Sequence, residues 1–151
     1  MATTEGLPDI RSLDAEGLRA AVAELGEKPF RAKQLEEWIW TKSAASFDEM
    51  TNLSTAFRTA LKARYRIERI RLQERQISTD RTIKCAFEVG PHQVVEGVLI
   101  PTSKRMTACI SSQVGCSLAC AFCATGRLKL LKNLSAGEIY DQVEILRAMA
   151  D

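Results

Sequence analysis

The sequence predicts an α/β protein with a helical domain (residues 1–65), a β-hairpin (66–101) and a strand–loop–helix unit (102–151). Three observations support this fold class. Apolar residues recur every three or four positions up to Tyr65, which is the period of an amphipathic helix. They alternate with polar residues between Ile83 and Ile100, which is the period of a half-buried strand. A short apolar stretch then leads into a cysteine-rich loop and a further helical segment.

Three helices are expected in the first domain because their apolar residues share one face. These residues are Leu18, Ala21, Val22 and Leu25, then Leu35, Trp38 and Ile39, and finally Phe57, Ala60, Leu61 and Tyr65. Gly26 stands where the first helix should end, and Pro29 precedes the second. Residues 46–49 (SFDE) have the capping-box pattern and predict a short helix. Trp38 is expected in the core, whereas Trp40 lies off the apolar stripe and could stack on bases.

The predicted hairpin consists of two strands joined at Gly90–His92. Ile83, Cys85, Phe87 and Val89 form the apolar face of the first strand, and residues 94–100 form the second. Cys85 is interpreted as a core cysteine and His92 as a solvated turn residue. The segment Met106–Ile110 is expected to be the first strand of the next domain, with a second capping box at residues 135–138 (SAGE). The following helix should bury Ile139, Val143, Leu146 and Ala150.

Glu96 shares a strand face with Val94, Val98 and Ile100. If that face is packed, a lone carboxylate among apolar side chains is costly unless it is paired or has a function. If the face is exposed, the carboxylate is simply solvated. The pattern alone leaves both alternatives open.

Cys116, Cys120 and Cys123 have the spacing C-x3-C-x2-C. A structural zinc site would need a fourth Cys or His nearby, and the single histidine, His92, lies far upstream. Three ligands with an open fourth position fit a catalytic iron–sulfur cluster better than a closed structural site. A zinc knuckle, a buried set of thiols or part of a disulfide framework are the alternatives.

Charge is unevenly distributed along the 151 residues. The formal net charge is +2, but residues 1–57 carry −4, residues 58–132 carry +9 and residues 133–151 carry −3. The basic middle could dock a polyanion, or it could be a solvated face. No apolar run is long enough to span a membrane, and the N-terminus does not read as a secretory signal. Five cysteines without such a signal suggest the reducing cytoplasm.

The residues around these cysteines resemble one family of radical enzymes that use S-adenosylmethionine (SAM). The resemblance lies in residues 109–116 (CISSQVGC), 123–126 (CATG), 133–134 (NL) and 138–139 (EI), with Phe122 directly before the third cysteine. These residues resemble the RlmN-type adenine-C2 methyltransferases of 23S ribosomal RNA and tRNA. Residues 28–34 (KPFRAKQ), 38–39 (WI) and 47–50 (FDEM) resemble the N-terminal accessory domain of that family.

This resemblance implies a helical N-terminal accessory domain, a β-hairpin and the first unit of a truncated radical-SAM partial (β/α)6 barrel. It implies that Cys116, Cys120 and Cys123 bind a [4Fe-4S] cluster whose fourth iron takes the amino and carboxylate groups of SAM. Glu96, in the setting VEGVLIP of residues 95–101, would serve in proton transfer. Cys109 would release the protein–RNA bond by forming a disulfide.

The resemblance also implies a mechanism in which one SAM methylates a C-terminal cysteine that this chain lacks. A second SAM then yields the radical that activates this methyl group for addition to the base, because C2 of adenine is not nucleophilic. An external electron donor such as flavodoxin, a monomeric state and a cytoplasmic location are expected. Residues 127–132 (RLKLLK) depart from the family pattern, and we expect the chain to be an incomplete copy, inactive alone. The alternatives are a Cfr-type adenine-C8 rRNA methyltransferase and a non-catalytic metal-binding RNA module.

Overall fold

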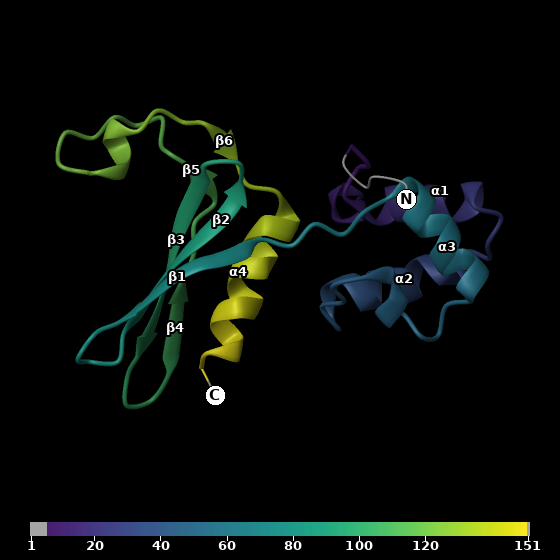
Figure 1. Cartoon of the computed structure of the whole chain (residues 1–151), viewed down its shortest axis with the longest axis horizontal. Coiled ribbons are helices and arrows are strands. Elements are labelled where there is room, and N and C mark those ends of the chain that lie inside the picture. The colour runs from purple at the N-terminus through teal and green to yellow at the C-terminus, as the bar shows by residue number, and fades with distance from the viewer. Residues whose placement is uncertain (1–5, 151) are drawn as a thin grey trace. The chain divides into compact units, whose positions relative to one another are not determined.

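The computed structural model describes residues 6–150, which form two compact units. The first unit ends at Glu68 and the second begins at Arg69. Figure 1 shows helices in the first unit, and a β-sheet with one long helix in the second. Each unit has a separate hydrophobic core.

The first unit contains the three helices that the sequence predicts. They are α1 (Ala15–Glu24), α2 (Phe30–Trp40) and α3 (Thr55–Arg64), accompanied by the 3-10 helices η1 (Ile10–Ser12) and η2 (Phe47–Glu49). Their apolar faces meet in one core, whose fully buried members include Val22, Leu35, Ile39, Phe57 and Leu61. The three periodic patterns therefore identify the core of this unit correctly.

Side chains fix where these helices begin. The Asp14 carboxylate accepts a hydrogen bond from the Gly17 N–H at the start of α1, and Ser54 does the same for Phe57 in α3. These bonds satisfy backbone donors that have no partner within the helix. The short helix predicted at residues 46–49 is present as the three-residue η2, with Ser46 as its N-cap. The capping-box hydrogen bond expected there is absent, because the Ser46 side chain makes no bond to the helix backbone.

Trp38 lies at the edge of the core. It is partly buried, its indole Nε1 donates to Asn52 Oδ1 at 2.6 Å, and the Lys42 ammonium lies 4.1 Å from its ring centroid. Trp40 also packs against this core, although the pattern left it undecided. Both indoles are therefore held by contacts within the helical unit.

The second unit is built on a four-stranded antiparallel sheet in the order β1-β2-β3-β4. The strands are β1 (Arg71–Ile77), β2 (Ile83–Gly90), β3 (Gln93–Pro101) and β4 (Met106–Cys109). β2 and β3 are the predicted hairpin, and β4 corresponds to the strand predicted at residues 106–110. The structure adds β1, which the sequence did not reveal, and hydrogen-bonds β4 to β3 in the same sheet.

Helix α4 (Ala136–Ala148) packs against one face of this sheet (Figure 1). The buried sheet residues on that face are Cys85, Phe87, Val95 and Leu99, and Leu146 of α4 completes the core. The predicted capping box at Ser135 and Glu138 is present. Within residues 6–150, no helix has the length and apolar character that a membrane crossing requires.

The inner face of α4 differs from the predicted one. Val143, expected inside, is 39% exposed, whereas Asp141 and Gln142 are fully buried. Both buried polar side chains have hydrogen-bonding partners in other segments, described below, and these partners offset the loss of water. The helix is therefore rotated so that two polar residues take inner positions.

Candidate functional site

Glu96 and Cys109 lie on one face of the sheet, the face turned away from α4. Successive residues of a strand point to opposite faces, and Val95, Gly97 and Leu99 of β3 are the buried set. Glu96 and Val98 therefore point the other way, and Cys109 pairs with Val98 in the β3–β4 register. We call this surface the open face and define it by Lys84, Glu96, Val98 and Cys109. The structure thus brings two of the predicted site residues together on one surface.

The carboxylate of Glu96 is paired across the open face with Lys84 of β2. Lys84 Nζ lies 2.8 Å from Glu96 Oε1, and the two side chains are 51% and 62% exposed, respectively. Of the two alternatives for Glu96, the exposed face is therefore the one that the structure shows. Lys84 was not singled out from the sequence, because nothing in the alternating pattern indicates which cross-strand neighbour a carboxylate will have.

Ser111, immediately beyond β4, is held from two sides. Its hydroxyl donates to the Glu96 carbonyl at 2.7 Å. The side-chain amide of Gln142 accepts from the Ser111 N–H and donates to the Ser111 carbonyl, both at 2.9 Å. This paired hydrogen bond uses the donor and the acceptor of one buried amide. The chain is thus fixed at the point where it enters the cysteine loop.

Asp141, the neighbour of Gln142, anchors α4 to the start of the sheet. Its carboxylate accepts from the Ile70 N–H at 3.1 Å and lies 3.0 Å from Arg69 Nε. The charge is fully buried, so these partners replace its lost hydration. Sequence reasoning missed both residues, because a polar residue within an apolar stripe is usually assigned to the solvent side.

The cysteine loop is closed at its base by two short strands, β5 (Gln113–Val114) and β6 (Lys132–Asn133), which pair antiparallel. Close to that base, Gly115 has a left-handed backbone (φ 76°). A Cβ built there would lie 2.1 Å from the Lys129 carbonyl oxygen, so only glycine fits without a shift of the backbone. The two arms of the loop therefore cross in direct backbone contact.

Cys116, Cys120 and Cys123 are all partly exposed along this loop. The Leu118 N–H donates to Cys116 Sγ at 3.4 Å, and a cavity of about 630 Å³ is lined by Cys116 and Cys120. Within residues 6–150, no three His, Cys, Asp or Glu side chains converge closely enough to hold a metal ion. The structure therefore places the three thiols in one loop but does not gather them around a common centre.

The donor set of this loop suits an iron–sulfur cluster. Between residues 113 and 133 it offers three thiols and no carboxylate or imidazole, so sulfur is the only strong metal ligand. Backbone N–H donation to sulfur, as at Cys116, is one way in which proteins tune such clusters. The Phe122 side chain, just before the third cysteine, is 94% exposed.

The other cysteines differ sharply in environment, although all five are free thiols. Cys109 is exposed on the open face. Cys85 is fully buried on the opposite face, 3.7 Å from Met149 Sδ, and burial raises the pKa of its thiol. The interpretation of Cys85 as a core cysteine is confirmed.

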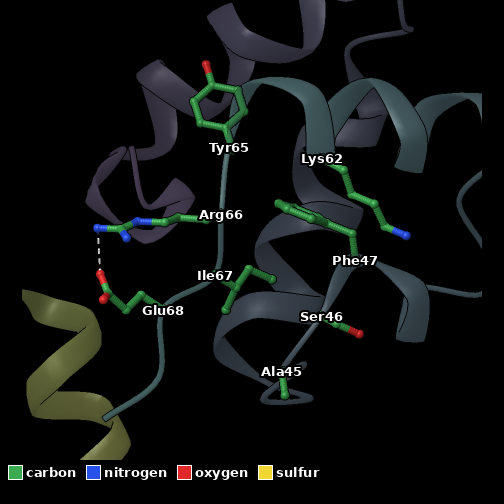
Figure 2. Close-up of a pocket in the computed structure, with 8 residues that line it drawn as sticks. All are labelled: Ala45, Ser46, Phe47, Lys62, Tyr65, Arg66, Ile67 and Glu68. Carbon is green, nitrogen blue, oxygen red and sulfur yellow. Dashed lines mark ion pairs between the residues drawn. The ribbon is translucent and has the colours of Figure 1, made fainter. Parts of the chain in front are cut away.

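A separate pocket of about 370 Å³ lies in the helical unit (Figure 2). Eight residues line it: Ala45, Ser46, Phe47, Lys62, Tyr65, Arg66, Ile67 and Glu68. Its two cations are already in ion pairs, Lys62 with Asp48 at 2.5 Å and Arg66 with Glu68 at 2.7 Å. None of the site residues predicted from the sequence lines this pocket.

Comparison with known proteins finds similarity to one family of RNA methyltransferases. Residues 8–67 match the family model of the ribosomal RNA large subunit methyltransferase N-terminal domain. A protein named probable dual-specificity RNA methyltransferase RlmN from Cytophaga hutchinsonii is 51% identical over 142 residues, covering 94% of this chain and 39% of that protein. The chain matches the N-terminal part of the RlmN-type RNA methyltransferases.

A second relative and one solved structure show the same similarity. The dual-specificity RNA methyltransferase RlmN of Anaeromyxobacter sp. is 45% identical over 139 residues, covering 92% of this chain and 37% of that protein. The crystal structure of a radical SAM methyltransferase from Sphaerobacter thermophilus superposes with a TM-score of 0.79 and 33% identity, covering 95% of this chain and 42% of that one. The predicted fold class is thereby confirmed. The chain spans about two fifths of the length of these RlmN-type relatives.

Proposed function

We propose that this chain is the N-terminal part of a cytoplasmic RlmN-type enzyme that methylates C2 of adenine in 23S rRNA and in tRNA. The observation that carries the proposal is the placement of Glu96 and Cys109 on one sheet face, directly before the three-cysteine loop. In this proposal residues 1–65 are the accessory domain, 66–101 the connection and 102–151 the start of the radical-SAM core. The enzyme would act as a monomer with an external electron donor such as flavodoxin.

Cys116, Cys120 and Cys123 would hold a [4Fe-4S] cluster and leave its fourth iron for SAM. The chemistry that a bound cluster supplies is one-electron reduction of SAM, which a side chain cannot provide. The antiparallel pairing of β5 and β6 holds together the two ends of the loop that carries the three thiols. The absence of other ligand types in the loop supports iron–sulfur over mixed Cys/His zinc binding.

Glu96 would transfer a proton at the adenine ring. Its carboxylate is exposed on the open face, and one of its oxygens is held by Lys84. A group that exchanges a proton with substrate must reach it within hydrogen-bonding distance, which an exposed carboxylate can do and a packed one cannot.

Cys109 would release the bond between protein and RNA by forming a disulfide with the methyl-carrying cysteine. Its thiol is free and exposed, on the same face as Glu96. In this step the Cys109 sulfur would attack the sulfur of the methyl-carrying cysteine, and the carbon–sulfur bond would break with its electron pair leaving on the carbon that stays with the RNA. The attack requires an accessible sulfur, and Cys109 meets this requirement, whereas the buried Cys85 does not.

Anaerobic reconstitution of the chain with iron and sulfide tests the cluster. We expect about four irons and four sulfides per chain, a visible charge-transfer absorption and an EPR signal after reduction. Cys116→Ala should lose them, and Cys109→Ala, the matched control, should retain them. Stoichiometric zinc without sulfide would instead support the metal-binding RNA module.

A further inference from the structure

The cations of the chain differ in how they are paired, and in the sheet unit Lys84 and Lys132, for example, lie in ion pairs with carboxylates. In the helical unit Lys62, Arg64 and Arg66 lie in ion pairs with carboxylates. At one end of the sheet, Arg81, Lys104 and Arg105 have no ion pair or side-chain hydrogen bond within the described part of the chain. Charges without a local counterion are the ones available to an anionic partner.

These three cations lie on two hairpin tips, residues 78–82 between β1 and β2 and residues 102–105 between β3 and β4. The register aligns Ile77 with Ile83 and Ile83 with Leu99, so both tips project from the same end of the sheet. Figure 1 shows the two tips close together at that end, away from the cysteine loop. We name residues 78–82 and 102–105 the basic tips. The first also carries Asp80, whose carboxylate accepts from the Ser78 hydroxyl and the Thr82 N–H, so the net charge of +2 of the two tips lies on the second.

Hydrogen bonds close the backbone of each tip, so the positions from which the cationic side chains extend are fixed. In the first tip the Ser78 N–H donates to the Thr82 carbonyl at 2.9 Å. In the second, the Thr102 N–H donates to the Arg105 carbonyl at 2.8 Å. Binding therefore orders only the side chains, which keeps its entropic cost low.

Arg81 occupies a backbone position that does not suit it. Its φ is 66°, in the left-handed region where Gly or Asn is the ordinary choice. An arginine there costs conformational energy that no contact within the described residues repays.

We propose that the basic tips bind the phosphate backbone of the RNA substrate, in the segment that flanks the target nucleotide. Arg105 lies four residues before Cys109 along the chain, roughly 13 Å at the rise of an extended strand. RNA that reaches Cys109 on the open face would thus have phosphates within range of the tips. This inference rests on the proposed function, because it assumes that the open face meets RNA.

An anionic membrane surface is the competing partner for basic tips. Two apolar residues, Ile77 and Met106, are exposed at the bases of the tips. Residues 75–84 and 100–107, however, contain no Trp, Phe or Tyr, the aromatic residues that typically anchor a protein in the lipid interface. RNA is favoured because cations in hydrogen-bonded turns, without an aromatic anchor beside them, fit a phosphodiester chain.

Fluorescence anisotropy with a short stem-loop RNA tests the proposal on the 151-residue chain. Each phosphate contact contributes to the salt dependence of binding, through counterion release. The double variant Lys104→Gln/Arg105→Gln should bind on the order of tenfold or more weakly at roughly 0.1 M salt and lower the slope of log K against log salt by about 1.4–1.8. Arg81→Asn, which suits the left-handed backbone, should lower the slope by about 0.7–0.9.

The matched control is Lys62→Gln/Arg64→Gln, which removes the same charge from ion-paired sites on α3. Thermal unfolding of each variant checks that the fold is intact. If the tip variants weaken RNA binding no more than the control does, the inference is overturned, while the proposed function stands on its cluster test. Tip-dependent binding to anionic phospholipid vesicles, with RNA affinity unchanged, would assign the tips to a membrane surface instead.

Discussion

The ammonium of Lys84 lies 2.8 Å from the carboxylate of Glu96, across neighbouring strands of an exposed sheet face. Both side chains are more than half exposed, so solvent screens the attraction, and such pairs contribute about 0–1 kcal/mol to stability. The pair is therefore better placed to orient Glu96 than to hold the sheet together.

The first prediction separates these two roles. Glu96→Gln and Lys84→Met should each lower the free energy of unfolding by less than about 1 kcal/mol. In a complete enzyme carrying this chain, Glu96→Gln should keep the cluster and SAM binding but lose methylated product, because an amide cannot exchange the proton. Denaturant unfolding and mass analysis of the RNA measure the two effects. Normal product from Glu96→Gln would exclude the proton-transfer role, and a methyl group at C8 would indicate the Cfr-type reaction.

A second prediction concerns Cys109. In the same complete enzyme, Cys109→Ala should still cleave SAM and attack the base, then remain attached to RNA. A denaturing gel should show the protein–RNA adduct beside normal formation of 5′-deoxyadenosine. Cys116→Ala is the contrasting variant, which should give neither. Turnover of Cys109→Ala without an adduct would return Cys109 to an ordinary strand cysteine.

The third prediction follows from the buried thiol of Cys85. Burial raises its pKa in the folded state above the unfolded value. The folded state therefore keeps its full stability below the unfolded pKa, about 8.5, and loses part of it as the pH rises toward the folded value. Urea unfolding across this pH range should show the decrease in the free energy of unfolding. In Cys85→Val this decrease should be smaller.

The fourth prediction tests the clamp on Ser111. Gln142→Leu leaves the Ser111 N–H and carbonyl without their partner, and an unsatisfied group that is fully buried costs about 1–3 kcal/mol. Ser111 is only half-buried, so we expect a loss of about 1–3 kcal/mol in the free energy of unfolding for the two groups together. The adjacent exposed residue provides the control, since Val143→Ala should cost less than about 1 kcal/mol. Equal losses for both variants would mean that the clamp contributes little.

The spacing of apolar residues predicted those helices and strands that have one buried and one exposed face. α1, α2, α3 and the β2–β3 hairpin each have one apolar face against a core, and all were predicted close to their observed bounds. β1 was missed because all seven of its residues are exposed, so no alternation of burial marks its sequence RLQERQI. Its place in the sheet depends on backbone pairing with β2, which composition does not encode.

The parts of the candidate site that lie close together in the sequence were predictable. The contacts between residues far apart in the chain were not. The spacing of Cys116, Cys120 and Cys123 is legible in the sequence. The partner of Glu96 and the burial of Gln142 are not, because each arises from strands and helices meeting at positions far apart in the chain. The assignment of roles to Glu96 and Cys109 came from family resemblance and stays a prediction.

The pairing of β5 with β6 joins the ends of the cysteine loop beside the four-stranded sheet, and Lys132 of β6 donates to the Val89 carbonyl of β2 at 2.9 Å. Ser111 is fastened on one side of this clasp, and Leu118 and Phe122 project freely on the other. The loop can therefore close around a centre without breaking a hydrogen bond of the four-stranded sheet. Amide hydrogen exchange should accordingly slow between residues 115 and 131 on cluster loading, while β2 and β3 keep the same protection in both states.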